Sequence, residues 1–357
     1  MLGNRKLVVD TFSEISDLIR PWIDVEFWDL QQHDIIPGAV YIIGRQQFNA
    51  NRDLIVDLIH NQTVDIVFSN PAEGSETVIT HCEVGLKVMD LLGQGKIPLI
   101  TGGDIPTQYP HLLYESFLPK LYDYVENTDA AQQYQDQYSA QRPYKFLFLN
   151  GRQRDHRRHM ISLLRPVLDQ ALWTNLDSGN GPLHLLPAGY EPDMFDSTVD
   201  TTVSVGLIKN QLFRGIWGEI YLKSRPYQDT YFSVVTETVF DYPYSFRTEK
   251  IWKPIAMGHP FIVAANAGYY RDLRRLGFQT FGHVIDESFD SIDNNQDRQA
   301  RIVEVIKDLC QQDLASFLDA CYNTCKYNQQ HLADMRLQVR AEFPNRFEQF
   351  IRERFRI

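Results

Sequence analysis

Hydrophobic and polar positions along the chain follow two rhythms. Short apolar runs rich in Val, Ile, Leu and Phe alternate with longer amphipathic stretches of helical period. The apolar runs predict strands at residues 6–10, 39–43, 64–69, 97–101, 144–149, 202–207, 231–236, 260–264 and 280–285. Helical periodicity is clear at residues 51–60 and 82–92. Strands that alternate with helices are typical of a parallel sheet wrapped by helices, so the predicted fold class is α/β.

A change in composition divides the chain into two similar halves. Between Tyr122 and Pro143 the sequence is rich in Gln, Asp, Asn, Tyr and Ala and has little apolar periodicity, and a new strand begins at Tyr144. We therefore predict an N-terminal domain over residues 1–140 and a C-terminal domain over residues 141–330. Ligands of open α/β sheets bind beyond the carboxyl ends of the strands, so function is expected where strands end, in a cleft between the halves.

The last segment, residues 331–357, predicts an amphipathic helix. One helical face carries Phe343, Phe347, Phe350, Ile351 and Phe355, and the rest carries Arg346, Arg352, Arg354 and Arg356. Our interpretation is a helix that packs on the body of the protein. Peripheral docking of this face on a membrane surface stays open as an alternative.

Length and charge narrow the classes of protein. The 357 residues are enough for about two domains, and a 43% hydrophobic content is that of an ordered globular chain. A net charge of −11 argues against a protein that coats nucleic acid with its whole surface. No apolar run approaches the roughly 18 residues that span a bilayer, and the start lacks the apolar stretch of a signal peptide, so we expect a cytoplasmic protein.

The four cysteines do not form a zinc-binding pattern. They are Cys82, Cys310, Cys321 and Cys325, and no second close pair accompanies the last two. We therefore expect reduced, partly buried thiols.

A cluster of arginines follows the first strand of the second half. The apolar strand stops at the turn pair Asn150-Gly151, a helix follows, and the junction carries Arg152, Arg154, Arg157 and Arg158. Guanidinium groups match phosphate oxygens, and a helix N-terminus adds N–H donors and the positive end of its dipole. We predict that at least one of these arginines binds phosphate, with Arg152 and Arg157 the better candidates. The alternative is a solvated basic face paired with surplus carboxylates.

A second constellation follows the strand that ends at Glu237. A loop rich in Tyr and Pro leads to Thr248, the predicted N-cap of a helix that opens with Glu249 and Lys250. Lys250 and backbone N–H groups could hold phosphate there, and Glu249 could accept hydrogen bonds from ribose hydroxyls. Ordinary helix capping is the alternative interpretation of these three residues.

These segments resemble a known enzyme family. Val234-Val-Thr-Glu-Thr238, the stretch from Phe246-Arg-Thr-Glu-Lys250 to Gly258-His-Pro-Phe-Ile-Val263, and Leu276-Gly-Phe-Gln-Thr-Phe281 look like the donor-binding half of GT-B glycosyltransferases. The similarity is to the α1,3-fucosyltransferase family and to a group of phage and bacterial glycosyltransferase-like proteins, over roughly residues 144–300. The sequence departs from the fucosyltransferase pattern at Thr238-Val239 and at Phe246-Arg247.

The resemblance implies a GT-B fold, with two Rossmann-like domains facing a central cleft, the first on the acceptor side and the second binding the donor. It implies a metal-independent, inverting transfer of a sugar from a nucleotide diphosphate sugar to a hydroxyl of a glycan, a lipid-linked saccharide or a protein. Carried over by position, Glu249 would bind the ribose, and Lys250 with an arginine of the Asn150-Gly-Arg152 segment would bind the diphosphate. Together with the arginine cluster, the candidate donor and phosphate contacts are Asn150, Arg152, Arg157, Glu237, Thr248, Glu249 and Lys250. No convincing Asp-x-Asp follows a strand, so we expect no metal and no cofactor besides the donor substrate. The expected partners are a nucleotide sugar and a carbohydrate acceptor, without nucleic acid.

A base must take the proton from the acceptor hydroxyl. Glu73 and Asp104 follow predicted strands of the first half and are the candidates, although loop carboxylates are commonly only solvated. Because the donor contacts are easier to place than the base, a non-catalytic sugar-nucleotide or glycan-binding protein of the same fold is the main alternative. A GT-B epimerase is the third hypothesis.

Overall fold

The structure, a computed structural model, describes most of the chain. The described residues are 5–10, 25–28, 34–71, 90–91, 93–105, 109–118, 121, 125, 129–138, 141–151, 153–176, 184–187, 190 and 222–355. The strand predicted at 202–207 and most of the helix predicted at 82–92 lie outside these residues. The chain divides into two compact units: unit 1 comprises Met1–Pro119, Tyr244–Phe246 and Arg336–Ile357, and unit 2 comprises Lys120–Pro243 and Arg247–Met335.

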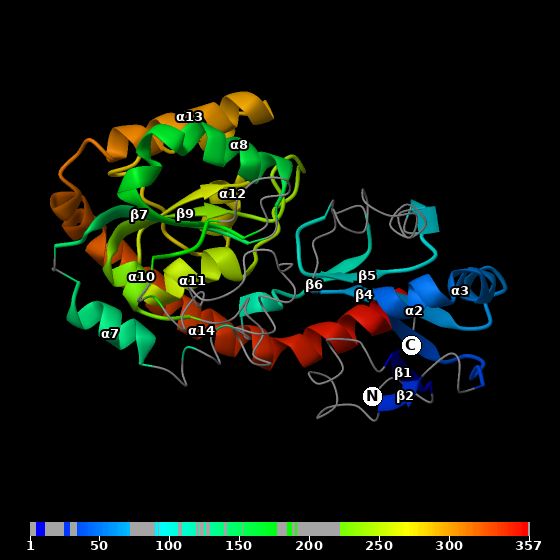
Figure 1. Ribbon diagram of the computed structural model, residues 1–357. Helices are drawn as coiled ribbons and strands as arrows, with labels where there is room; N and C mark the ends of the chain where they lie inside the picture. The colour runs from blue at the N-terminus through cyan, green and yellow to red at the C-terminus, as the bar shows by residue number, and fades with distance from the viewer. Residues whose placement is uncertain are drawn as a thin grey trace. The chain divides into compact units, whose positions relative to one another are not determined.

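Unit 1 is built on a parallel sheet in the order β2-β1-β3-β4-β5-β6 (Figure 1). Its strands are β1 (Leu7–Asp10), β2 (Val25–Trp28), β3 (Val40–Gly44), β4 (Asp65–Asn70), β5 (Leu99–Thr101) and β6 (His111–Leu113). The helices α2 (Arg45–Ala50) and α3 (Arg52–His60) connect β3 to β4. All five residues of β3 are buried, as expected for a parallel strand covered on both faces. The strands predicted in this half are confirmed, and the short strands β2 and β6 were not predicted.

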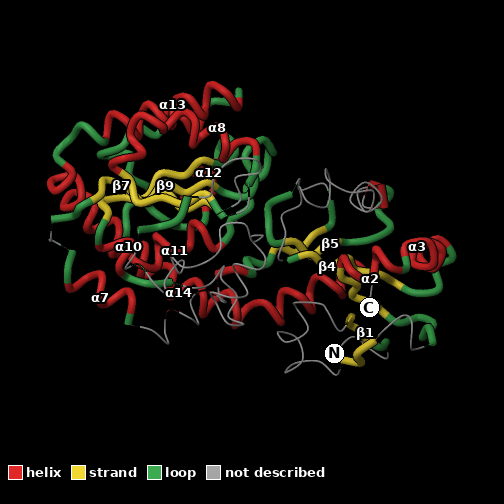
Figure 2. The backbone as a smooth tube through the Cα atoms, viewed as in Figure 1, coloured by secondary structure: helices red, strands yellow, loops and turns green. Residues whose placement is uncertain are grey.

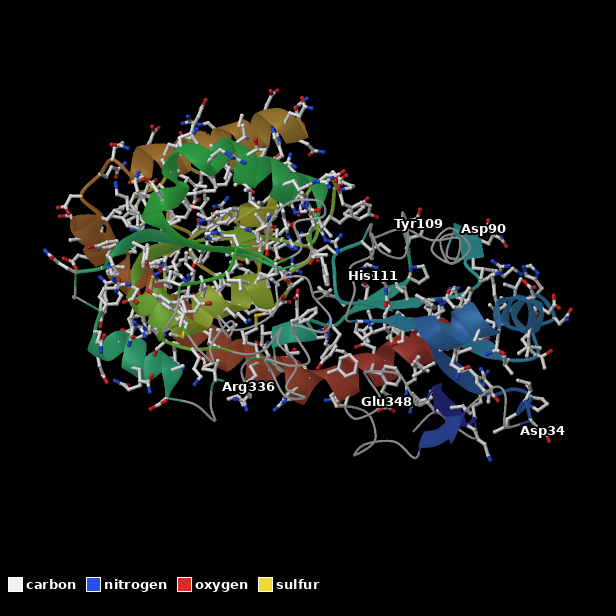
Figure 3. All side chains as sticks on the ribbon, viewed as in Figure 1. Asp34, Asp90, Tyr109, His111, Arg336 and Glu348 are labelled. Carbon is white, nitrogen blue, oxygen red and sulfur yellow. The ribbon has the colours of Figure 1, made fainter. Side chains whose placement is uncertain are left out.

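The two faces of this sheet bury different partners, because alternate residues of a strand point to opposite faces. One face packs Val8, Tyr41 and Ile43 with Ile55 and Ile59 of α3. The other face packs Leu7, Val9, Val40 and Ile42 against Phe343, Phe347 and Ile351 of helix α14 (Leu314–Phe355). Figure 3 labels Arg336 and Glu348 on this part of α14. The apolar helical face read from the sequence is therefore buried against the sheet, and the helix begins earlier than residue 331.

The turns after β4 and β5 approach each other so closely that one position must be glycine. A Cβ atom at Gly102 would lie 1.9 Å from the carbonyl oxygen of Pro71. We expect Gly102→Ala to lower the free energy of unfolding of unit 1 by about 1–3 kcal/mol, because the backbone of one turn must move. Urea denaturation checks this, with Gly93→Ala as the matched control, since the described residues place no atom from outside the local backbone within 4 Å of the Cβ position at Gly93. Equal denaturation midpoints for the two variants would contradict the prediction.

Unit 2 is built on a second parallel sheet in the order β10-β9-β7-β8. Its strands are β7 (Tyr144–Asn150), β8 (Ala171–Asn175), β9 (Thr230–Thr236) and β10 (Phe261–Ala264). Its helices include α7 (Ala130–Asp136), α8 (Asp155–Leu164), α10 (Arg225–Gln228), α11 (Glu249–Met257), α12 (Tyr269–Arg275) and α13 (Asn295–Leu309). Helices α8 and α13 cover one face of this sheet and α10 and α11 the other (Figures 1 and 2). An α/β protein with two parallel sheets is thus confirmed.

One predicted strand of this half is wrong. Residues 280–285 form turns in which the N–H groups of Val284 and Ile285 both donate to the carbonyl of Phe281, at 2.9 and 2.8 Å. Phe281 and Ile285 are buried four residues apart, a spacing that suits a turn as well as a strand.

The cysteines and the length of the apolar helices bear on the class of protein. Cys310, Cys321 and Cys325 are free and buried, whereas Cys82 lies outside the described residues. Within the described part of the chain, no helix combines the length and the apolar character needed to cross a membrane.

Candidate functional site

The order of strands in unit 2 reverses between β7 and β9. From β7 the chain passes through α8 to β8 on one side, and from β9 on the other side it passes through α11 to β10. The two helices therefore leave the carboxyl edge of the sheet toward opposite faces (Figure 1). In open α/β sheets this reversal is where ligands bind. The ends of β7 and β9 define the candidate site, which we call the switch-point edge.

The end of β7 provides a buried amide and an open turn. Asn150 is 2% exposed, and its Oδ1 accepts a hydrogen bond from Oγ1 of Thr236 at 2.7 Å, which joins the ends of β7 and β9. Its Nδ2 has no hydrogen-bond partner among the described residues. At the next residue, Gly151, no atom of the described residues other than its chain neighbours lies within 4 Å of the position that a Cβ would occupy. A buried donor and free space therefore adjoin the same strand end.

Helix α8 begins four residues after Gly151, at Asp155, and no side chain caps its N-terminus. Its N-cap residue is Arg154, whose side chain has no acceptor atom and makes no capping hydrogen bond. Arg154 is half-buried, and its carbonyl accepts from the N–H of Arg158 at 3.0 Å, whereas its side chain makes no capping hydrogen bond within the described part of the chain. Arg158, in contrast, is exposed and pairs with Asp155. The acidic Asp155 in the first turn of α8 partly offsets the positive end of the helix dipole, but it pairs with Arg158.

Two further side chains of α8 hold the end of β9. Arg157 is 3% exposed, and its Nη2 donates to the carbonyls of Thr236 and Glu237 at 3.0 and 3.3 Å. The ring of His156 stacks on Phe240 and lies 3.0 Å from the Glu237 carbonyl through Nε2. Burial, reinforced by the charge of Arg157, lowers the pKa of His156 to about 3, so the ring is neutral and Nε2–H is the donor.

Glu237 directly follows β9 and is fully buried. Its Oε1 accepts from the N–H of Thr248 and the hydroxyl of Tyr269, both at 3.1 Å. Its Oε2 accepts from Oγ1 of Thr248 at 2.7 Å and from the N–H of Thr238 at 3.2 Å. Each carboxylate oxygen therefore already has two donors, which is about its full capacity.

Helix α11 begins as the sequence predicts, with Thr248 as its N-cap. Oγ1 of Thr248 accepts from the N–H of Lys250, and Nζ of Lys250 donates to Oε1 of Glu249 at 2.7 Å and to Oγ1 of Thr248 at 3.0 Å. Burial alone would raise the pKa of Glu249, but the positive charges of Lys250 and Lys253 outweigh it and lower the pKa. Glu249 is therefore ionised at neutral pH, and the ammonium of Lys250 compensates its charge.

The structure brings most of the sequence candidates together. Asn150, Arg157, Glu237, Thr248, Glu249 and Lys250 all lie at the carboxyl edge of the unit 2 sheet. Arg152 and Glu73 lie outside the described residues. Asp104 belongs to unit 1, follows β5, and donates its backbone N–H to the carbonyl of Ser245 at 2.8 Å.

Sequence reasoning did not single out the open turn at Gly151, the half-buried Arg154 or the stacked His156. Arg157, which the sequence analysis ranks above Arg154 as a phosphate contact, donates to backbone carbonyls instead. A signal for this existed, because Arg157, Met160 and Leu164 are spaced to share the buried face of α8.

In the described residues, no group of three His, Cys, Asp or Glu side chains is arranged to hold a metal ion. Comparison of the chain with protein-family models, with curated proteins and with solved structures gives no significant match.

Proposed function

We propose that this protein is a glycosyltransferase of GT-B form that moves a sugar from a nucleotide diphosphate sugar to an acceptor hydroxyl, and that unit 2 binds the donor. The observation that carries the proposal is the switch-point edge, where a buried amide donor, an open glycine turn and an uncapped helix N-terminus adjoin one another. The sequence resemblance of residues 144–300 to the donor half of GT-B enzymes supports the same assignment.

The diphosphate is proposed to lie against Gly151 and the first turn of α8. A phosphate there would meet backbone N–H groups, the positive end of the helix dipole and the guanidinium of Arg154. Arg157 and Glu237 then act beneath the site by holding the end of β9, since Nη2 of Arg157 and both carboxylate oxygens of Glu237 already bond to the protein.

The first turn of α11 is proposed to hold the ribose. An ionised Glu249 is an acceptor for ribose hydroxyls, and Lys250 can add an electrostatic contact to the phosphates. Because Glu249 already compensates the charge of Lys250, Arg154 is expected to contribute more to phosphate binding.

In the proposed reaction, the acceptor oxygen forms a bond to the anomeric carbon, and the bond between that carbon and the diphosphate oxygen breaks. The α8 N-terminus and Arg154 stabilise the negative charge of the leaving diphosphate without requiring a metal. A carboxylate takes the acceptor proton, and Asp104 and Glu73 of unit 1 remain the proposed bases.

Thermal unfolding of the protein with GDP, UDP, CMP, ADP and dTDP tests the donor assignment. A nucleotide present at about 100 times its Kd should stabilise the folded state by about 2.7 kcal/mol and raise the Tm. Absence of a shift with every nucleotide would overturn the proposal. Hydrolysis of the matching nucleotide sugar without acceptor then distinguishes a transferase from a non-catalytic binding protein, and conversion to an epimer would identify an epimerase.

Gly151→Val places a side chain in the proposed phosphate space. The free protein should keep its Tm within a few degrees, because no described residue other than the chain neighbours lies within 4 Å of the Cβ position. Nucleotide affinity should fall by tenfold or more, about 1.4 kcal/mol. Titration calorimetry measures the affinity. Gly93→Val is the control, since Gly93 has the same open surroundings in unit 1. Full nucleotide affinity in Gly151→Val would show that the phosphates bind elsewhere.

A further inference from the structure

We propose that Glu237 is a positioning residue of the donor site, which ties the starts of three helices to the end of β9 and does not touch the donor. This inference rests on the proposed function and reassigns a residue that the sequence resemblance places among the donor contacts. It rests on the observation that four donors inside unit 2 already occupy both carboxylate oxygens of Glu237.

The carboxylate connects two helices to the strand. Through the N–H and the hydroxyl of Thr248 it fixes the N-cap of α11, at 3.1 and 2.7 Å. Through the hydroxyl of Tyr269, at 3.1 Å, it holds the first residue of α12. With 0% of the residue exposed and both oxygens accepting two hydrogen bonds, no acceptor position is left for a sugar or ribose hydroxyl.

The backbone carbonyl of the same residue connects the third helix. It accepts from Nε2 of His156 at 3.0 Å and from Nη2 of Arg157 at 3.3 Å, both in the first turn of α8. Glu237 therefore joins the N-termini that the proposed function assigns to phosphate and ribose. A change in its side chain should alter the spacing between these two helix starts.

Glutamine cannot replace this carboxylate without loss. All four groups that face the two oxygens are donors, two of them backbone N–H groups that cannot reverse their role. The NH₂ group of a glutamine would face a backbone N–H whichever way it is turned. Glu237→Gln should therefore shift the start of α11 while the fold of unit 2 persists.

The test measures binding of inorganic pyrophosphate and of the best-binding nucleoside diphosphate by titration calorimetry, at a temperature where every variant is folded. Glu237→Gln is expected to weaken both ligands by a similar factor, about tenfold. A loss confined to the nucleoside diphosphate would mean that Glu237 contacts the sugar directly and would overturn the proposal, as would unchanged binding of both ligands.

Two further variants keep the result interpretable. Ser233 lies in the middle of β9, the strand that Glu237 follows, and its hydroxyl forms a buried hydrogen bond of 2.9 Å with His259. Ser233→Ala removes this bond and should destabilise unit 2 without weakening the binding of pyrophosphate. If Glu237→Gln does not fold, Thr248→Val takes its place and should weaken the binding of both ligands. Thr248→Ser, which keeps the hydroxyl, should bind both ligands as the wild type does. Failure of Thr248→Val to weaken either ligand would contradict the inference. If the wild type binds neither ligand, the proposed function itself fails, which is a separate outcome.

Discussion

Replacing Arg142 by methionine is expected to lower the free energy of unfolding of unit 2 by about 3–5 kcal/mol. Arg142 is 7% exposed, and its guanidinium donates to the carbonyls of Tyr227, Thr230 and Tyr138, at 2.8, 2.5 and 2.8 Å. The rings of Tyr134, Tyr138 and Tyr231 surround it, with centroids 5.1 to 5.7 Å from its central carbon. Methionine fills part of the space but removes the donor that Arg142 provides to each of the three carbonyls.

Urea denaturation followed by tryptophan fluorescence measures this loss. Arg158→Met is the matched control, because Arg158 is exposed and contacts the nearby side chains of Asp155 and Gln153, so its effect should stay below about 1 kcal/mol. If the two variants unfold at the same urea concentration, the network around Arg142 does not stabilise the fold as described.

The stability of unit 2 is expected to fall by about 4 kcal/mol between pH 7 and pH 5 through His156 and His259. Burial lowers the pKa of each to about 3, with a further contribution from a nearby arginine. His259 bonds to the Thr230 carbonyl and the Ser233 hydroxyl, at 2.8 and 2.9 Å. Each ring therefore stays neutral in the folded protein while the same ring of the unfolded chain takes up a proton below about pH 6.5, which favours unfolding.

Because the pKa of both histidines is lowered in the folded protein, the free energy of unfolding falls as the pH falls. Stability is complete above about pH 6.5 and decreases as the pH falls toward 3, by about 2 kcal/mol per histidine at pH 5. Denaturation curves at a series of pH values measure it. In His259→Gln the loss between pH 7 and 5 should be about half as large, even though the variant is less stable overall. A pH dependence identical to that of the wild type would contradict the assignment of this histidine.

The sequence predicts the parts of the fold that local patterns determine. The buried runs of β3, β7, β9 and β10 are recognisable because both faces of a parallel strand are apolar. The start of α11 is recognisable because a threonine before an acidic first turn is a local capping signal.

What the sequence does not predict depends on contacts between distant segments. The four donors around Glu237 come from residues 238, 248 and 269, so nothing near position 237 indicates that its carboxylate is fully used. The helical spacing of Arg157 with Met160 and Leu164 indicates that Arg157 is buried, but only the packing of α8 on the sheet shows that Arg157 bonds to backbone carbonyls. The reversal of strand order between β7 and β9, which defines the site, is likewise a property of topology.

The most direct test of the central claim is a crystal structure of the protein with the nucleoside diphosphate that raises its Tm most. The account predicts that the diphosphate lies at the carboxyl edge between β7 and β9, against Gly151 and the first turn of α8, with Arg154 as a ligand and with the Glu237 carboxylate still bonded to Thr248 and Tyr269. Phosphates bound away from this edge, or a Glu237 carboxylate in contact with the ligand, would contradict it.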